Sequence, residues 1–392
     1  MGEKTDKISG RAKQAVGAVT GDEDTKRKGE REEDKGKLKG KLEEENRVSF
    51  SFGHRLGRLV AAVVATTGIA FAVSVASASA AVPVEQLLTS AAREEAAAHL
   101  EYYGYATGAD KAHLTDVANV WRTVGDVEHQ DHYTREVTLA NLYSETDNEA
   151  NLKTAITQAQ QVAQKDFARA EENPGSQAAR VLHNIAIQED EDAGLLSNAL
   201  NALQHGGSIP TAPPVKEVGV EVSPRPSYSG TFYNDLTAGS GSALQDSAWL
   251  WAEYQFMAKT AVDTGQAKLA ALLSGLENQE ISQNWVLVSN VAGFVNGVAM
   301  NLEHSIGGEQ GAIEVYTRDA KEAEEDGNPS VASTFLNIRG DEEGHHQTFT
   351  TELQEITSTG HGHHGSSTGH GHHGSSTGHG HHGSSTGHGH HG

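Results

Sequence analysis

The chain has 392 residues, no cysteine and a formal net charge of −23. The lack of cysteine excludes disulfides, thiolate zinc sites, cysteine nucleophiles and cysteine-held iron–sulfur centres. The charge is uneven, because residues 1–58 carry 15 Lys/Arg against 12 Asp/Glu whereas residues 83–392 carry 15 against 41. Such an acidic body argues against a nucleic-acid partner, which needs a basic surface, and suits a protein that handles cations.

Residues 1–46 contain almost no large apolar side chains, so this segment is expected to be disordered or weakly helical. Glycine and lysine recur in it around Thr20-Gly21-Asp22, in "GRAKQAVGAVTGDEDTKRKGEREEDKGKLKGKLEE". In these repeats the segment resembles the CsbD-like general-stress proteins. A charged, flexible lead with no such relationship is the alternative.

Residues 59–82 carry no charge and, at about 1.5 Å per residue, could span a bilayer as a helix. Basic residues precede this segment, and the first charge after it is Glu85. This asymmetry predicts a cytoplasmic N-terminus and a body outside the membrane. The small residues Ala78-Ser79-Ala80 also fit a signal-peptidase site, so the protein is expected to be membrane-anchored or secreted. A buried helix of a soluble protein is the remaining alternative.

Residues 84–204 and 243–356 each show apolar residues at helical spacing with few helix breakers, which predicts an all-α body. Between them, residues 205–242 hold five of the eight prolines together with many Gly and Ser, as in a linker or a long ordered loop.

The tail, residues 358–392, repeats "STGHGHHGS" and holds 12 of the 22 histidines. Its Gly and Ser content is incompatible with a packed core, and its imidazoles could bind Zn²⁺, Ni²⁺ or Cu²⁺ loosely. A solubility spacer and an engineered addition are the alternatives.

The two helical blocks repeat each other. "AEENPGSQAARVLHNIAIQEDED" begins at residue 170 and "AEEDGNPSVASTFLNIRGDEEGH" at residue 323, an offset of 153 that aligns Glu189 with Glu342. Earlier in the blocks an offset of 152 aligns Tyr102 with Tyr254 and Glu128 with Glu280. We therefore expect two four-helix bundles in tandem, one in residues 84–204 and one in residues 243–356.

A four-helix bundle can hold a di-iron site with one Glu from each of two helices and a Glu-x-x-His from each of the others. Positions i and i+3 share a helix face, so both side chains reach the same metal pair. Glu342 and His345 have this spacing, and Phe335 and Ile338 on the same stripe indicate that Glu342 faces inward. A solvated surface pair is the alternative.

Residues 301–346, "NLEHSIGGEQGAIEVYTRDAKEAEEDGNPSVASTFLNIRGDEEGHH", resemble the rubrerythrin branch of the ferritin-like family. The matching features are "N-L-x(5)-G-E", a Tyr seven residues on, and a closing Glu-x-x-His 33 residues after Glu309. "REEAAAHLEYYGYA" resembles the family's first helix, with Glu95 seven residues before Tyr102 and 33 before Glu128. The resemblance implies tandem ferritin-like bundles that bind iron, reduce peroxide or O₂ or oxidise ferrous iron in stress defence, and place Tyr102 and Tyr254 near the metals. With no cysteine to hold a relay iron, electrons must come from an external donor.

Neither block matches the family's six ligand positions completely. The first block has Glu95, Glu128, Asp131, Ile156, Glu189 and Asp192 there, and the second has Ser247, Glu280, Gln283, Glu309, Glu342 and His345. His132, one residue beyond Asp131, could serve at i+4. The candidate metal ligands are therefore Glu95, Glu128, Asp131, His132, Glu189, Asp192, Glu280, Glu309, Glu342 and His345.

Three interpretations of these residues stay open. In the first, the acidic residues form salt bridges, for example with Arg122 or Arg135. In the second, the bundles are a non-enzymatic, envelope-attached scaffold with degenerate sites and a metal-sequestering tail. In the third, helices from both blocks complete one centre, within a chain or across a homodimer, since the first block keeps Glu95 and the second keeps Glu309.

Overall fold

The structure, a computed structural model, describes residues 82–238 and 241–360. In this part of the chain all regular structure is helical and no strand occurs, which confirms the all-α expectation. The elements are α3 (Val84–Lys111), α4 (Thr115–Val127), the π-helical turn η1 (Glu128–Tyr133), α5 (Thr134–Leu139), α6 (Asn148–Glu172), α7 (Gln177–His205), α8 (Gly230–Thr237), α9 (Ala243–Asp263), α10 (Ala267–Gln279), the π-helical turn η2 (Glu280–Asn284), α11 (Trp285–Ala292), α12 (Val298–Glu325) and α13 (Pro329–Gly360).

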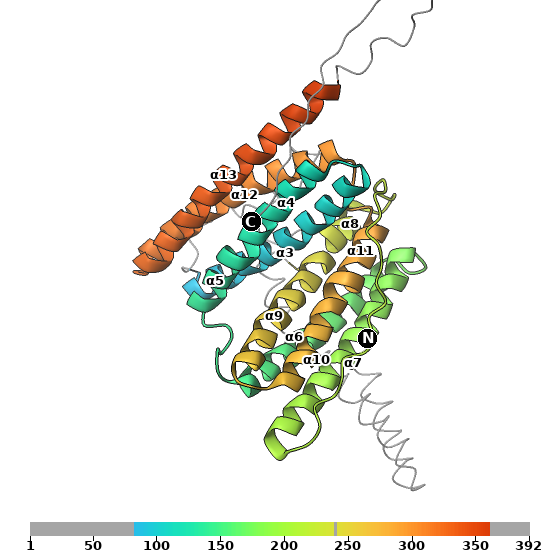
Figure 1. The fold of residues 1–392 in the computed structure, drawn as a ribbon, viewed down its shortest axis with the longest axis vertical. Coiled ribbons are helices and arrows are strands. Elements are labelled where there is room, and N and C mark those ends of the chain that lie inside the picture. Colours follow the sequence, from blue (N-terminus) through green and yellow to red (C-terminus); the bar gives the residue numbers. More distant parts are fainter. Residues whose placement is uncertain (1–81, 239–240, 361–392) are drawn as a thin grey trace, which may run out of the picture.

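The long helices form four antiparallel hairpins that pair across the two sequence blocks. The hairpin of α3 with α4–η1–α5 packs against α12 and α13, and we call this group the first bundle. The hairpin of α6 and α7 packs against α9 and α10–η2–α11, and we call this group the second bundle. Figure 1 shows the first bundle as the blue-green and orange-red helices, and the second as the green and yellow-orange helices. This pairing differs from the expected arrangement of one bundle per block.

Connections between the hairpins explain how the helices cross over. After α5 the chain turns at Asn141, whose φ is 51°, and restarts at α6, where the Asp147 carboxylate accepts hydrogen bonds from two backbone N–H groups. This connection carries the second hairpin away from α3. α9 then packs against both α3 and α6, and one hydrophobic core runs through both bundles. A hairpin buries its apolar face against any partner of matching pattern, so repetition in the sequence leaves the pairing open.

The described part of the proline-rich segment, residues 206–238, is an ordered loop that includes α8. Its backbone follows the second bundle, where Val218 N–H donates to Ser282 O at 3.0 Å and Ser223 N–H to Val295 O at 3.2 Å. The loop also passes over Gly293, which ends α11 with φ of 58°, and a Cβ there would lie 2.5 Å from Pro224 O. The segment expected to be a linker or a long ordered loop therefore lies along α11 and requires glycine at position 293.

Several expected segments lie outside the described residues. These are the CsbD-like segment 1–46, nearly all of the apolar segment 59–82, and the histidine repeats beyond residue 360. Among the helices that are described, none combines the length and apolar character that crossing a membrane requires.

Candidate metal centre

Six acidic and histidine side chains from four helices meet in the middle of the first bundle. Five of them are buried, and the side chain of His345 is 13% exposed. They are Glu95 from α3, Glu128 and His132 from η1, Glu309 from α12, and Glu342 and His345 from α13. Glu95 and Glu309 come from different sequence blocks, so the arrangement is the one in which helices of both blocks complete one centre within a chain.

The π-helical turn η1 decides which residue after Glu128 faces the centre. A π turn contains more residues than an α turn, which moves the inward position from i+3 to i+4. His132 is therefore fully buried, whereas Asp131 turns outward, where its Oδ1 lies 2.7 Å from Arg135 Nε and its side chain is 40% exposed. Asp131, one of the expected ligands, thus lies outside the set of six.

Each histidine points its Nδ1 atom at three carboxylates. His132 Nδ1 lies 2.9 Å from Glu128 Oε2, 3.3 Å from Glu342 Oε1 and 3.5 Å from Glu95 Oε2. His345 Nδ1 lies 3.0 Å from Glu128 Oε1, 3.3 Å from Glu342 Oε2 and 3.9 Å from Glu309 Oε2. Glu128 and Glu342 thus present one oxygen to each histidine, while Glu95 and Glu309 each serve one side.

The centre contains two overlapping ligand groups of the size that a metal ion needs. In each group, one donor atom from every residue lies within 4.8 Å of the others. The groups are Glu95, Glu128, His132 and Glu342, and Glu128, Glu309, Glu342 and His345. Glu128 and Glu342 belong to both groups, which is the pattern expected when carboxylates bridge a pair of ions.

Two tyrosines hold the unshared carboxylates from opposite sides. The Tyr102 hydroxyl donates to Glu309 Oε1, and the Tyr316 hydroxyl donates to Glu95 Oε1. Each tyrosine follows a ligand-position Glu by seven residues, two helical turns, and contacts the Glu of the other helix. The tyrosines and glutamates are thus related by an approximate two-fold symmetry.

Tyr316 and Glu136 were not among the residues selected from the sequence. The Tyr316 hydroxyl also lies 2.9 Å from Glu136 Oε1, and Glu136 is fully buried on α5. The signals were present, since Tyr316 stands to Glu309 as Tyr102 does to Glu95. Glu136 also continues the i, i+4 stripe of Glu128 and His132.

Burial and mutual repulsion shift the protonation of the cluster. Burial, and then the charges of Glu128 and Glu342, raise the pKa of Glu95 well above its usual value. Burial alone would lower the pKa of His345, but the Glu128 and Glu342 carboxylates beside it raise the pKa to about 9. The pKa of His132 is raised for the same reason by its carboxylate partners. The centre thus favours positive charge at the two imidazole positions.

Buried oxygens without a hydrogen bond test whether these residues fit a metal pair. Glu128 Oε1 and Glu342 Oε1 accept no hydrogen bond, although histidine nitrogens lie 3.0 Å and 3.3 Å away. Unpaired buried carboxylate oxygens are costly unless a cation satisfies them. On the outer side of His132, Nε2 lies 3.3 Å from Asp341 Oδ2, which orients the ring as carboxylates orient metal-bound histidines. The residues therefore fit two cations.

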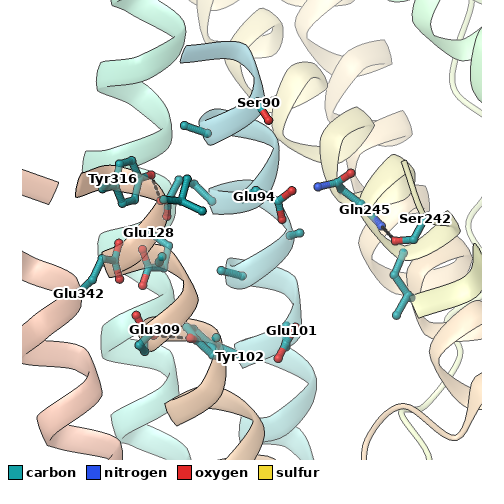
Figure 2. Close-up of a pocket in the computed structure, with 18 of the residues that line it drawn as sticks. Ser90, Glu94, Glu101, Tyr102, Glu128, Ser242, Gln245, Glu309, Tyr316 and Glu342 are labelled. Carbon is teal, nitrogen blue, oxygen red and sulfur yellow. Dashed lines mark hydrogen bonds between the residues drawn. The ribbon is translucent and has the colours of Figure 1, made fainter. Parts of the chain in front are cut away.

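A cavity of about 230 Å³ reaches the centre from the space between the two bundles. Its inner wall includes Glu95, Glu128, Glu309 and Glu342, and its other side includes Glu94, Glu101 and Gln245. Figure 2 shows Tyr316, Glu342, Glu309 and Glu128 on one side of α3, with Glu94 on the side that faces Gln245 of α9. Burial raises the pKa of Glu101 to about 7. The cavity gives a small molecule or ion a route lined with carboxyl groups.

The second bundle brings together fewer of the predicted ligands. Glu189 and Asp192 on α7 lie close to Glu280 on η2, and all three are buried. Ile156 and Ser247 stand where the first bundle has Glu309 and Glu95. The Tyr254 hydroxyl, equivalent to that of Tyr102, is buried without a hydrogen-bond partner among the described residues.

The C-terminal part of the helical body is similar to a known protein family. Residues 300–364 match the family model Rubrerythrin. The match covers α12 and the described part of α13, which carry Glu309, Glu342 and His345. A search of curated proteins and a search of solved structures each gave no match. The rubrerythrin match supports the resemblance found in this part of the sequence.

Proposed function

We propose that the first bundle binds two iron ions and works as an oxidoreductase of the rubrerythrin type, reducing peroxide or O₂ or oxidising ferrous iron. The observation that carries this proposal is the sharing of Glu128 and Glu342 between two ligand groups, each with its own histidine and its own further glutamate. The rubrerythrin match over α12 and α13 supports the same conclusion.

The donor set suits iron or manganese and argues against Cu(I). Four carboxylates and two imidazoles suit Fe and Mn, whereas soft thiolate ligands, which would favour Cu(I), do not occur in this cysteine-free chain. Iron held by these residues would supply the electrons that reduce peroxide or O₂. Glu128 and Glu342 would help to hold both ions, because each presents one carboxylate oxygen to each histidine.

The protein's own groups position ligands and protons around this centre. Tyr102 and Tyr316 hold the carboxylates of Glu309 and Glu95 in place. The cavity between the bundles admits a small oxidant, and Glu101, whose pKa burial raises to about 7, can give up or take a proton there at neutral pH. Reduction of peroxide to water consumes protons as well as electrons. The electrons come from an external donor, because the chain has no cysteine to hold a relay iron.

Matched variants of two neighbouring glutamates test the proposal. Glu342 is buried in the centre, whereas Glu343 beside it is exposed and pairs with Arg339. Iron per chain and the near-ultraviolet absorbance of an oxo-bridged pair should be measured after anaerobic loading with Fe²⁺ and exposure to air. We expect the parent and Glu343→Gln to show the absorbance and Glu342→Gln to lose it. Iron bound by the histidine tail is common to all three chains and cancels in the difference.

Equal absorbance in Glu342→Gln and Glu343→Gln would refute the di-iron assignment. The non-enzymatic alternative, a scaffold with a metal-sequestering tail, predicts that iron is held equally by both variants and that neither shows bridged-pair absorbance. Anchoring or secretion through residues 59–82, with the bundles outside the cytoplasm, remains part of the proposal and rests on the sequence of that segment.

A further inference from the structure

The acidic cluster of the second bundle has a defined arrangement of satisfied and unsatisfied oxygens. The Asn284 side-chain amide donates to Glu189 Oε1 at 2.8 Å and to Glu280 Oε1 at 3.2 Å. The Gln279 amide donates to Asp192 Oδ2. Each carboxylate therefore has one oxygen held by an amide, while the other, Glu189 Oε2, Asp192 Oδ1 and Glu280 Oε2, has no hydrogen-bond partner.

A chain of amides fixes the direction in which Asn284 points. Lys216 N–H donates to Gln283 Oε1, the Gln283 amide donates to Gln188 Oε1 at 2.7 Å, and the Gln188 amide donates to Asn284 Oδ1 at 3.1 Å. Because its oxygen is already an acceptor, Asn284 presents its NH₂ group to the carboxylates. Such outer contacts are how proteins orient the ligands of a metal.

Comparison with the first bundle shows where an ion fits. The sequence offsets place Glu280, Glu189 and Asp192 where the first bundle has Glu128, Glu342 and His345. Those three form the second ligand group of the first bundle, together with Glu309. Asn284 occupies the place of His132, and its NH₂ group lies where the other ion would bind. The second bundle thus keeps one ion position and closes the other.

Tyr254 supplies independent support for a ligand at this position. Its hydroxyl is fully buried and unpartnered, because the acceptor that Tyr102 finds in Glu309 is replaced by Ile156. Tyr254 occupies the position of Tyr102, whose hydroxyl points into the ligand cluster of the first bundle, so its hydroxyl is expected on the inner side of the second bundle with Glu189, Asp192 and Glu280. A buried hydroxyl of this kind requires a partner that the described protein atoms do not supply.

We propose that the second bundle binds a single hard divalent cation, of the Mn²⁺ or Mg²⁺ type, through Glu189, Asp192 and Glu280, with Tyr254 holding a water on the ion. One oxygen from each carboxylate lies within 4.8 Å of the others, so one ion contacts all three. A proton shared by Glu189 and Glu280 would satisfy two of these oxygens and leave Asp192 and Tyr254 unpaired. The donors are all oxygen, which favours Mg²⁺ and Mn²⁺ over Zn²⁺ or Cu²⁺.

Manganese binding to the full chain tests this site. Glu128→Gln with Glu342→Gln removes the two shared ligands of the first bundle, and this double variant is the background for the measurement. Bound Mn²⁺ is counted from the loss of the free-ion electron paramagnetic resonance signal. We expect one Mn²⁺ per chain above the contribution of the tail. Adding Glu189→Gln should remove it, and adding Glu191→Gln, exposed two residues further along α7, should not.

Melting temperatures and Mn²⁺ affinities test the same site if one of the variants is unstable. In the same Glu128→Gln, Glu342→Gln background, Mn²⁺ should raise the melting temperature of the Glu191→Gln chain and leave that of the Glu189→Gln chain unchanged. In that background Tyr254→Phe should weaken Mn²⁺ binding about fivefold. Equal Mn²⁺ counts and equal melting shifts in Glu189→Gln and Glu191→Gln would overturn the proposal, and a shared proton predicts that result. Iron loading of the first bundle, measured in Glu189→Gln alone, reports separately on the proposed function.

Discussion

Tyr102 and Glu309 are separated by 207 positions in the chain, yet the Tyr102 hydroxyl donates a hydrogen bond to Glu309 Oε1. The contact joins α3 of the first sequence block to α12 of the second, and Tyr316 makes the reciprocal contact with Glu95. Through these two hydrogen bonds, each unshared glutamate is held by a tyrosine from the other sequence block. The candidate centre therefore needs residues from both sequence blocks.

Replacing Tyr102 by Phe should weaken metal binding while leaving the fold intact. The substitution removes the donor that orients Glu309 and keeps the ring, which packs 5.2 Å from Phe349 between ring centroids. Loss of such an outer contact typically costs about tenfold in metal affinity. Competition with a chelator measures the change, and Tyr103→Phe, at a side chain that is 40% exposed, is the matched control. Equal affinities of the two variants would contradict the role given to Tyr102.

The π-helical turn makes His132, and not Asp131, the partner of Glu128. His132→Ala should therefore abolish the bridged-pair absorbance, because it removes the only nitrogen donor of one ligand group. Asp131→Asn should leave the absorbance unchanged, since Asp131 pairs with Arg135 outside the centre. Iron content and absorbance of the two variants distinguish these positions. A loss in Asp131→Asn equal to that in His132→Ala would contradict the placement of Asp131 outside the centre.

Glu95→Gln and Glu309→Gln should damage the same centre although they lie in different blocks. Each removes the unshared carboxylate of one ligand group, and the two groups meet at Glu128 and Glu342. We expect either variant alone to lose most of the bridged-pair absorbance, and the double variant to lose little more, because residues of one network are not additive. Glu303→Gln, exposed on α12, serves as the control. Half the absorbance in each single variant and none in the double variant would instead indicate two independent centres.

The stability of the protein should depend on pH through Glu253. This side chain is fully buried, both of its oxygens lack hydrogen bonds, and burial raises its pKa to about 8, with the Arg93 charge opposing the shift. Folding therefore favours the protonated form. The stability this carboxyl contributes is complete below its usual pKa of 4.5 and is lost as pH rises to about 8.

Glu253→Gln, which cannot ionise, should lack this dependence. Between pH 4.5 and 8 the parent should lose about 1.4 kcal/mol per pH unit in unfolding free energy relative to the variant. Denaturant titrations at pH 5, 6.5 and 8 measure the difference, and Glu303→Gln should follow the parent. Parallel curves for parent and Glu253→Gln would mean that water or a cation satisfies this carboxyl.

Part of the candidate centre was predictable from the sequence. Glu342 and His345 were identified from their spacing, because helical periodicity fixes which positions share a face. Glu95, Glu128 and Glu309 were identified from the resemblance to the rubrerythrin family. His132 was identified only as an alternative to Asp131, since a π turn leaves no clear sign in the sequence. Glu94 and Glu101 were missed because they face a cavity between bundles, and the shape of that cavity depends on how α3 meets α9.

Local patterns in the sequence predicted that the body is helical, which face of most helices is buried, and that two similar blocks carry different residues at the expected ligand positions. These properties depend on local periodicity, which each helix satisfies independently of its neighbours. The pairing of α3 and α4 with α12 and α13, by contrast, depends on contacts between helices far apart in the chain. Several pairings bury similar apolar faces, so the choice depends on the connections and on packing across the whole chain. That choice collects Glu95, Glu128, His132, Glu309, Glu342 and His345 in one bundle and leaves Glu189, Asp192 and Glu280 to the other.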